Sequence, residues 1–374
     1  MLFFEAPSSF TGEDVVELQV HGNPLLVHRL LEHLGTLGVR MAEPGEFARR
    51  AILNGRMSVL EAEGLRDLIG AATDAQLRQA QARSGGVPPW ILQARESLRP
   101  WLAQAEAAVD YGEEEGIELD LAYMQRSLEP LRCLFHVEQQ RAEAARWIRD
   151  GIALALVGRP NAGKSTLFNQ LAGDDRAIVT EVPGTTRDVL EVRTEWRGIP
   201  LRLYDTAGLR MTEDPVERLG VARVERVMRE ADLVLHLVPV GDRAGDPQLL
   251  ERLRPYAEKC LEVRTHADLG PSEGLRVSAV AGDLDALEEA LKARFLGGSS
   301  PDACLGALAT VRQRELLKEM AFQLDLLFSL HPGCPPELPA SVLQGAWGLL
   351  ARLTGEDRAE TTLDALFSGF CLGK

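Results

Sequence analysis

The run LALVGRPNAGKSTLFNQL (residues 154–171) constrains the fold of this chain more than any other feature. It contains Gly158, four further residues and then Gly163-Lys164-Ser165, which is the spacing of a phosphate-binding loop. A strand-like apolar run precedes the motif and an amphipathic helical pattern follows it, which is the context that it requires. The run therefore predicts a nucleotide site at a strand–helix junction of an α/β domain.

The chemistry of this loop follows from its residue types. Glycines let backbone N–H groups converge on phosphate oxygens, and the N-terminus of the following helix adds partial positive charge. We expect Lys164 to reach the outer phosphates and the Ser165 hydroxyl to bind Mg²⁺. The loop residues expected to contact the nucleotide are Asn161, Ala162, Gly163, Lys164, Ser165 and Thr166.

A second motif, Asp205-Thr206-Ala207-Gly208, follows the apolar run LRLY. A DxxG tetrapeptide by itself is often only a turn with a cap. At a strand end downstream of a phosphate loop, Asp205 is expected on the magnesium side and the Gly208 N–H beside the γ-phosphate. Between the two motifs lies VPGTTRD, whose Thr186 is expected to close over the metal as a switch threonine. Two adjacent threonines alone would more often mark a solvated loop.

The segment LEVRTHAD, which ends at Asp268, lies where a GTPase carries its base-reading loop, but Thr265-His266 replaces the usual Asn-Lys pair. Asp268 can accept hydrogen bonds from both N–H groups on the Watson–Crick edge of guanine, and adenine offers no such pair. Ser278-Ala279, in the later run RVSAVAGD, matches the last guanine-side loop. We expect a guanine site in which Thr265 partly replaces Asn by hydrogen bonding within the loop. His266 is the weaker substitute for Lys.

The chain falls into regions of different periodicity. Residues 1–57 mix strand-like and helical pieces, and residues 58–149 and 299–374 are helical. In residues 150–298 short apolar runs alternate with helical patterns, which predicts a parallel α/β sheet. The fold class is thus multidomain α/β plus all-α. Either the domains follow one another, or the α/β domain is inserted into a helical domain whose two halves pack together.

Charge and cysteine usage narrow the function classes. A net charge of −15 argues against a chain that wraps nucleic acid by itself, so such a role needs a local basic face or a more basic partner. The sequence has no run of eighteen apolar residues and no basic-then-apolar leader, so neither a membrane span nor a secretion signal is indicated. The five scattered cysteines favour reduced thiols in the cytoplasm over a disulfide frame or zinc site.

The order of the motifs resembles the MnmE (TrmE) family of tRNA-modification GTPases. The residues that carry the resemblance are GRPNAGKST, PGTTRD, DTAGLR and the terminal FCLGK, preceded by FTGEDVVELQVHG and EPGEFARRAILNGR. The match covers essentially the whole chain, and FCLGK is especially specific. The resemblance implies an α+β folate-binding N-terminal domain, a discontinuous helical domain and an inserted Ras-like G domain.

The resemblance also implies a mechanism. In the family, G domains meet across a potassium ion when GTP is bound, and this association drives hydrolysis. Asn161 matches the position whose side chain ligates potassium, and the backbone around Thr180 and Val182 would supply further oxygens. Glu217 matches a water-positioning glutamate, although it could equally be a first-turn helix carboxylate. Arg210 lies in the same switch region and is expected to help couple it.

The family's chemistry at tRNA is implied in the same way. Family members form homodimers through the N-terminal domain. With a flavin-dependent partner of the MnmG/GidA type, in a heterotetramer, it installs an aminomethyl or carboxymethylaminomethyl group on C5 of the wobble uridine, using a tetrahydrofolate one-carbon unit. The matching folate-side or tRNA-side positions are Glu46, Arg56, Cys371 and Lys374. Arg56 replaces a Lys and is equally credible as a surface charge, and Cys371 as a small buried hydrophobe.

Two departures from the family leave other hypotheses open. The base-reading loop is altered, and the family's N-terminal domain begins upstream of MLFFEAP. Either the natural start lies upstream of Met1, or the chain is a truncated member that lacks part of the folate pocket and dimer surface. One alternative is therefore a degenerate scaffold that binds nucleotide without catalysis. The retained residues that argue against it are Lys164, Ser165, Thr186, Asp205 and Glu217. The other is a ribosome-assembly GTPase of the Era/Der type, which lacks a split helical domain ending in FCLGK.

Overall fold

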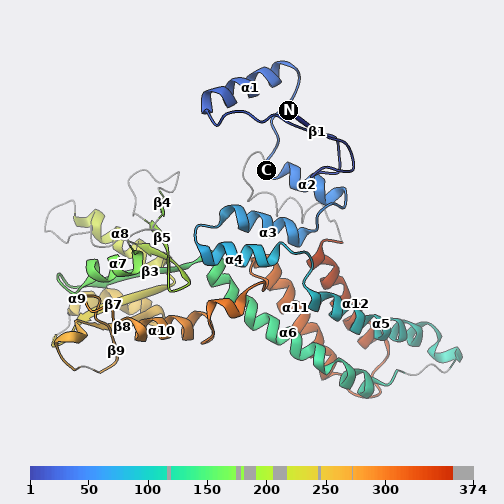
Figure 1. The fold of residues 1–374 in the computed structure, drawn as a ribbon. Coiled ribbons are helices and arrows are strands. Elements are labelled where there is room, and N and C mark those ends of the chain that lie inside the picture. Colours follow the sequence, from blue (N-terminus) through green and yellow to red (C-terminus); the bar gives the residue numbers. More distant parts are fainter. Residues whose placement is uncertain are drawn as a thin grey trace. The chain divides into compact units, whose positions relative to one another are not determined.

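The computed structural model describes residues 1–115, 119–173, 178–180, 191–204, 217–242, 246–271 and 273–356, with backbone alone for residues 112–115, 178–180 and 217–223 (Figure 1). The chain forms two compact units. The first contains residues 1–69, 83–139 and 310 onward, and the second contains residues 70–82 and 140–309. The units alternate along the sequence, which agrees with an inserted arrangement rather than with a simple succession of domains.

The second unit is built on a mixed sheet whose strand order among the described residues is β4-β5-β6-β3-β7-β8-β9. The strands are β3 (Ile152–Gly158), β4 (Ile178–Thr180), β5 (Glu191–Trp196), β6 (Ile199–Tyr204), β7 (Leu233–Pro239), β8 (Cys260–Thr265) and β9 (Leu275–Arg276). The pairs from β6 across to β9 are parallel, and the β4–β5 and β5–β6 pairs are antiparallel.

The antiparallel β5–β6 hairpin departs from the predicted parallel sheet. Trp196 pairs with Ile199, so only Arg197 and Gly198 form the connection. Both residues have positive φ, 50° and 79°. A two-residue hairpin turn whose twist matches that of the strands requires positive φ at both positions. Such a connection is far too short for the crossover between parallel strands. The other predicted strands of this region are confirmed.

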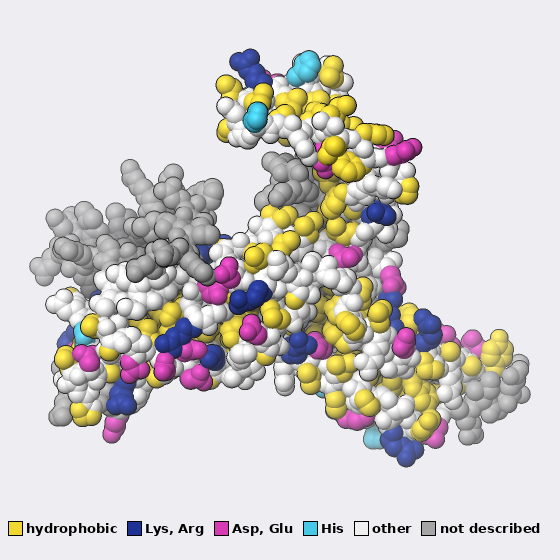
Figure 2. All heavy atoms as spheres, in the orientation of Figure 1, with side chains coloured by type: hydrophobic (Ala, Val, Ile, Leu, Met, Phe, Trp, Pro, Cys, Tyr) yellow, Lys and Arg dark blue, Asp and Glu magenta, His cyan; other side chains and the backbone are white. Residues whose placement is uncertain are grey.

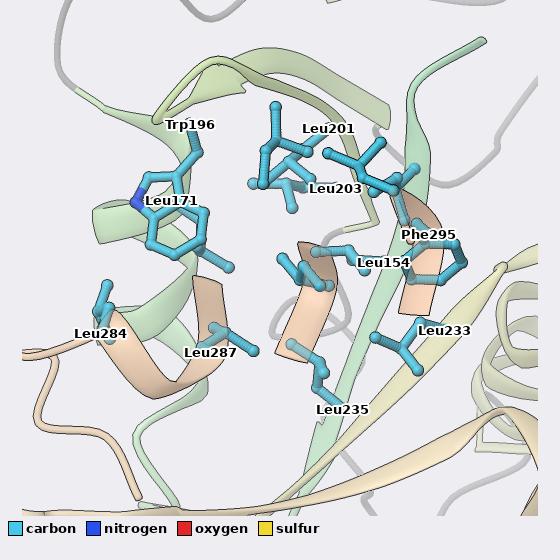
Figure 3. Close-up of a cluster of buried hydrophobic side chains, with 14 of the residues drawn as sticks. Leu154, Leu171, Trp196, Leu201, Leu203, Leu233, Leu235, Leu284, Leu287 and Phe295 are labelled. Carbon is cyan, nitrogen blue, oxygen red and sulfur yellow. The ribbon is translucent and has the colours of Figure 1, made fainter. Parts of the chain in front are cut away.

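Helices cover both faces of the sheet. On one face lie α7 (Lys164–Ala172) and α10 (Asp285–Phe295), which contribute buried Leu171 and Leu287 to the cluster in Figure 3. On the other face lie α8 (Glu217–Glu230) and α9 (Pro247–Leu253). Strand β3 serves both faces, because Leu154 packs in the first cluster and Ala155 in the second. A strand buried on both sides reads as a continuous apolar run, as this one does.

Two helical segments from outside the predicted α/β region also belong to this unit. They are α4 (Asp74–Arg83) and the C-terminal end of α6 (Leu121–Asp150), which place Ala75, Ala145 and Ile148 in the same core cluster. Gln79, which is buried on α4, donates a 3.0 Å hydrogen bond to the carbonyl oxygen of Ala307. The packed unit around the sheet is therefore larger than sequence periodicity suggests.

The first unit is mainly helical. Its elements are β1 (Leu2–Phe4), β2 (Val15–Glu17), α1 (Pro24–Thr36), α2 (Glu46–Leu53), α3 (Val59–Gly70), α5 (Pro89–Glu115), the first part of α6, α11 (Val311–Ser329) and α12 (Glu337–Thr354). Strand β2 pairs antiparallel with β1 and is shorter than the predicted run 14–20. Leu128 and Phe135 of α6 are fully buried, as their spacing predicts.

The start of this unit carries many apolar side chains on its surface. Figure 2 shows hydrophobic side chains over this region, and Leu25, Leu37 and Met41 are each more than 60% exposed. Helix α1 buries none of its residues. Nowhere in the described ranges is a helix both long enough and apolar enough to cross a membrane.

Candidate nucleotide site

The phosphate loop connects β3 to α7, as the sequence predicts. Its first glycine, Gly158, has no room for a side chain, because an added Cβ would lie 2.6 Å from the Leu237 carbonyl oxygen on β7. Its last glycine, Gly163, caps α7 with φ of 85°, a left-handed conformation that favours glycine. Asn161 also has a positive φ, 62°. Strand packing on one side and the helix start on the other thus fix the path of this loop.

Lys164 lies within the loop that it is expected to serve. Its ammonium donates hydrogen bonds of 2.7 Å and 2.6 Å to the carbonyl oxygens of Gly158 and Arg159. Partial burial lowers the pKa of Lys164 below its ordinary value. Ser165 and Thr166 follow in the first turn of α7, and both are exposed. This turn offers hydroxyls and helix N–H groups to an anion.

The base-reading loop begins at the end of β8, and Thr265 joins it to the phosphate loop. The Thr265 hydroxyl donates a 3.0 Å hydrogen bond to the carbonyl oxygen of Ala162. Thr265 is 5% exposed and Ala162 is fully buried. The sequence prediction that Thr265 bonds within its own loop is therefore wrong in its partner, since the acceptor belongs to the phosphate loop.

Asp268 lies in a short 3₁₀ turn, Ala267–Leu269, and its side chain is exposed. Its Oδ1 accepts a 2.6 Å hydrogen bond from the Ser278 hydroxyl, which in turn accepts a 3.3 Å hydrogen bond from the N–H of Ala281. The Ser278 hydrogen bond holds the pKa of Asp268 below its usual range. Ala279 packs against the core cluster. The structure thus brings Asp268 and Ser278 together, as a guanine site requires.

Several predicted site residues lie outside the described residues. They are Val182, Thr186, Asp205, Gly208, Arg210, Cys371 and Lys374. Two others are described by their backbone alone, Thr180 as the last residue of β4 and Glu217 as the first residue of α8. Strand β6 ends at Tyr204, one residue before the DTAG motif, which agrees with the predicted strand end.

The metal ligands predicted within the described residues fit the ions implied for them. They are the exposed hydroxyl of Ser165, the exposed side-chain amide of Asn161 and backbone carbonyl oxygens at Thr180. Oxygen donors of this kind suit hard cations such as Mg²⁺ and K⁺. Over the same part of the chain, no three His, Cys, Asp or Glu side chains gather as a site for a softer metal would require.

A separate cavity of about 300 Å³ lies in the N-terminal part, and Glu46 lines it. Both carboxylate oxygens of Glu46 accept hydrogen bonds from arginines, at 2.5 Å and 2.7 Å from Arg40 and 2.6 Å from Arg50. The Arg40 guanidinium, the Glu43 N–H and Arg50 hold the pKa of Glu46 well below its usual range. Arg56 is exposed and lies beside Gly12, and it is not among the residues that line this cavity.

Sequence reasoning missed two parts of this arrangement. The first is the contact of the His266 ring with the phosphate loop, where Nε2 lies 3.4 Å from the carbonyl oxygen of Asn161. The second is the arginine pair around Glu46. His266 has a positive φ of 60°, and no local sequence pattern predicts this conformation or the contact.

Comparison with known proteins agrees with these motifs. The family model for the MnmE helical domain matches residues 59–371, and the model for the GTP-binding protein TrmE N-terminus matches residues 1–56. The tRNA modification GTPase MnmE of Methylorubrum populi is 43% identical over 381 residues, covering 98% of this chain and 83% of that protein. Its counterpart in Symbiobacterium thermophilum is 41% identical over 394 residues, covering 100% of this chain and 85% of that protein.

Among solved structures, Aquifex aeolicus Era bound to GDP·AlF₄⁻ is 20% identical, and the match covers 49% of this chain and 69% of that one. The TM-score is 0.31, which is too low to bear on function or architecture. The two MnmE sequences are much more similar to this chain than Era is, since they match nearly all of it at about twice the identity. The chain therefore belongs to the MnmE family of tRNA modification GTPases.

Proposed function

We propose that this chain is a potassium-activated GTP hydrolase that acts in tRNA modification together with a flavin-dependent partner. The observation that carries the proposal is the direct contact between the two halves of the nucleotide site. Thr265, in the base-reading loop, donates to the carbonyl oxygen of Ala162 in the phosphate loop. This hydrogen bond links the phosphate cradle to the loop that carries the guanine-reading carboxylate, as recognition of a whole nucleotide requires.

Within this site each residue has a role that its chemistry allows. Lys164 neutralises the outer phosphates. To do so, its ammonium leaves the two loop carbonyl oxygens to which it donates and binds the phosphate oxygens instead. Ser165 and Thr186 hold Mg²⁺, with Asp205 on the magnesium side, and the Gly208 N–H senses the γ-phosphate. Asp268 reads guanine, and Ser278-Ala279 complete that side of the pocket.

The remaining catalytic roles concern the switch region and the potassium site. Asn161 and the backbone around Thr180 and Val182 hold K⁺, which when bound offsets the negative charge that develops on the transferring phosphoryl group. Glu217 positions the attacking water and Arg210 couples the switch to it. Glu217 is the first residue of α8, so the alternative of a first-turn helix carboxylate stays open.

For the whole protein we propose a cytoplasmic homodimer that joins an MnmG/GidA-type partner in a heterotetramer. The pair would install an aminomethyl or carboxymethylaminomethyl group on C5 of the tRNA wobble uridine. The one-carbon unit would come from a tetrahydrofolate near Glu46 and Arg56, with Cys371 and Lys374 on the tRNA side. The net charge of −15 supports this division of labour, because a more basic partner would hold most of the tRNA.

The proposed domains are an N-terminal domain in residues 1–57, a helical domain in 58–149 and 299–374, and a G domain in 150–298. Match of the helical-domain model to residues 59–371, across the inserted sheet, supports this order. The same match disfavours an Era/Der-type ribosome-assembly GTPase, which has no such split helical domain. Retention of Lys164 and Ser165 in a formed loop disfavours a scaffold without catalysis.

The test is GTP hydrolysis by the purified chain in potassium and in sodium at equal ionic strength. We expect a large stimulation that is specific to potassium and is lost in Asn161→Ala. The matched control is Asn169→Ala, an exposed asparagine on α7 beyond the phosphate loop. Equal rates in the two salts, or equal losses in the two variants, would contradict potassium activation.

A further inference from the structure

The two residues that replace Asn-Lys in the base-reading loop both contact the phosphate loop. Thr265 Oγ1 donates to the Ala162 carbonyl oxygen at 3.0 Å. His266 Nε2 lies 3.4 Å from the Asn161 carbonyl oxygen. A carbonyl only accepts, so the ring nitrogen that faces it carries the hydrogen. Two successive residues of one loop therefore donate to two successive carbonyls of the other.

The backbone at this contact is held in an uncommon conformation on both sides. Asn161 and His266, the two partners of the second hydrogen bond, have φ of 62° and 60°. Asn and His are among the non-glycine residues most often found in this left-handed region, yet it still costs free energy. Such residues persist where their surroundings over-determine them, and they gather at functional sites.

Packing at Gly163 shows how closely the two loops approach. A Cβ added to Gly163 would lie 3.6 Å from His266 Nε2 and 3.7 Å from Thr265 Cβ. Both distances are ordinary van der Waals contact, so the side chains of the two residues cover the Gly163 backbone. The contact is therefore a packed surface with two hydrogen bonds, rather than a single polar link.

The hydrogen bond of Thr265 also limits what this residue can do for the base. Its only side-chain hydrogen is donated to a buried carbonyl, and Thr265 itself is 5% exposed. Asp268, three residues later, is exposed and ionised, and its carboxylate accepts hydrogen bonds from the Ser278 hydroxyl and from its own backbone N–H. Reading of the guanine edge thus rests on Asp268, while Thr265 and His266 determine where Asp268 stands.

We infer that Thr265 and His266 are positioning residues that fix Asp268 relative to the phosphate loop and so set the guanine selectivity of this site. The inference rests on the proposed nucleotide site and adds a cause for its base preference. A nucleotide is held by its phosphates at one end, and Asp268 can meet both guanine N–H groups only if its distance from that end is fixed. Preorganisation of this kind yields affinity and selectivity without a contact to the base.

The test compares binding of GDP and IDP, because hypoxanthine lacks the 2-amino group and offers Asp268 one N–H instead of two. In Thr265→Val, which keeps the shape and removes the hydroxyl, we expect the preference for GDP over IDP to fall about fivefold, the effect of one hydrogen bond. Thr265→Ser should restore the preference. If the preference is unchanged in Thr265→Val while GDP still binds, the inference is overturned.

Thr194→Val is the matched control for this substitution. Thr194 is 1% exposed and its hydroxyl donates a 2.8 Å hydrogen bond to the Ala172 carbonyl oxygen at the other end of α7. The chemistry, burial and stability cost of the two changes are therefore alike. We expect Thr194→Val to leave the preference for GDP over IDP unchanged. An equal fall in both variants would show that general destabilisation, and not positioning, is the cause.

A double-substitution experiment separates positioning from direct contact. If Thr265 acts through Asp268, adding Thr265→Val to Asp268→Ala should change the dissociation constant of GDP by less than about twofold. A further fivefold loss in that background would overturn the inference, since it would show that Thr265 contributes independently of Asp268.

His266 is tested by two replacements that share the cost of a positive φ. His266→Gln keeps an N–H donor and His266→Leu removes it, so the preference for GDP over IDP should fall only in the second. Equal behaviour of the two variants would remove His266 from the inference. All these measurements use diphosphates at fixed salt without tRNA. A failure to hydrolyse GTP would therefore contradict the proposed function and leave their outcome unchanged.

Discussion

Ser278 Oγ donates a 2.6 Å hydrogen bond to Asp268 Oδ1, and the two residues belong to loops that follow the neighbouring parallel strands β8 and β9. The carboxyl ends of parallel strands share one edge of a sheet, which is where open α/β sheets bind their ligands. The hydrogen bond favours the ionised form of Asp268 and lowers its pKa. The carboxylate is thus kept as an acceptor for guanine.

Removal of this hydrogen bond should move the acid limit of GDP binding. In Ser278→Ala the pKa of Asp268 returns toward its ordinary value, so protonation sets in at a higher pH than in the unaltered protein. We expect GDP binding to weaken first in the variant as the pH falls toward about 4, the ordinary pKa of an aspartate. Titrations across this range, with Ser329→Ala as a control for an exposed hydroxyl on α11, check this. Coincident pH profiles would show that Ser278 does not tune Asp268.

Gly158 should tolerate no side chain. In Gly158→Ala the new Cβ would lie 2.6 Å from the Leu237 carbonyl oxygen, so the phosphate loop or β7 must shift. We expect GDP binding to fall by at least about tenfold and the protein to lose about 1–3 kcal/mol of stability. The control is Gly348→Ala on α12, where a Cβ meets no atom within 4 Å. That change should be neutral or slightly stabilising. Unaltered GDP binding in Gly158→Ala would contradict the described loop path.

Lys164→Ala should separate nucleotide binding from stability. The ammonium is partly buried against two carbonyls, and its pKa is lowered by that burial, so its removal costs the empty protein little. GTP binding should nevertheless fall about a hundredfold, because the charge on the outer phosphates is no longer offset. Calorimetric titration and thermal unfolding measure the two effects. Lys318→Ala, an exposed lysine on α11, is the control. If the free energy of unfolding fell by as much as the free energy of GTP binding, the role of Lys164 would be purely structural.

Glu63 should be essential to the stability of the helical unit. It is 1% exposed and accepts hydrogen bonds from Arg312 Nη2 at 2.7 Å and from the Thr310 hydroxyl at 3.1 Å. Glu63→Ala leaves Arg312 without this partner and should cost about 3–5 kcal/mol. Glu319→Ala, an exposed change on α11, should cost almost nothing. Chemical denaturation measures both variants, and similar midpoints would refute this role.

The same carboxyl predicts a pH dependence of stability. Burial acts to raise the pKa of Glu63, but Arg312 and Gln313 outweigh it, so the pKa lies below its ordinary value. A lowered pKa in the folded state contributes stability above the pKa of the unfolded chain, and this contribution is lost as the pH falls through the folded-state pKa. Stability should therefore decline on acidification in the unaltered protein. In Glu63→Gln, which has no titrating group at this position, the decline should be smaller.

The local features of the site could be predicted from sequence, because each depends on a few neighbouring residues. Gly158, Gly163 and Lys164 lie in one short motif, and the strand and helix around them follow from their own periodicity. Asp268 was predicted from its place after a strand. The loops of Asp268 and Ser278 are brought together only by the pairing of β8 with β9, yet the sequence motifs already put both residues on the guanine side.

Contacts between distant segments could not be predicted. Thr265 and Ala162 are 103 residues apart in sequence, and only the order β3-β7-β8 in the sheet brings them together. The hairpin at Arg197-Gly198 was not predicted, because this pair is not one of the Asn-Gly or Asp-Gly pairs that mark a two-residue turn in sequence. Likewise, Ala75 of α4 joins the core of the α/β unit although its helix lies far upstream in sequence. The small residues on one face of this short helix do not indicate which element of the fold they pack against.

Binding of GDP, ADP and XDP by the unaltered chain and by Asp268→Asn tests the central claim most directly. If the loop THAD reads guanine through Asp268, GDP should bind at least about a hundredfold more tightly than ADP. Asp268→Asn should then favour XDP, because its amide N–H can meet the second carbonyl of xanthine. Equal binding of GDP and ADP by the unaltered chain, or no change of preference in Asp268→Asn, would contradict a guanine site at this loop.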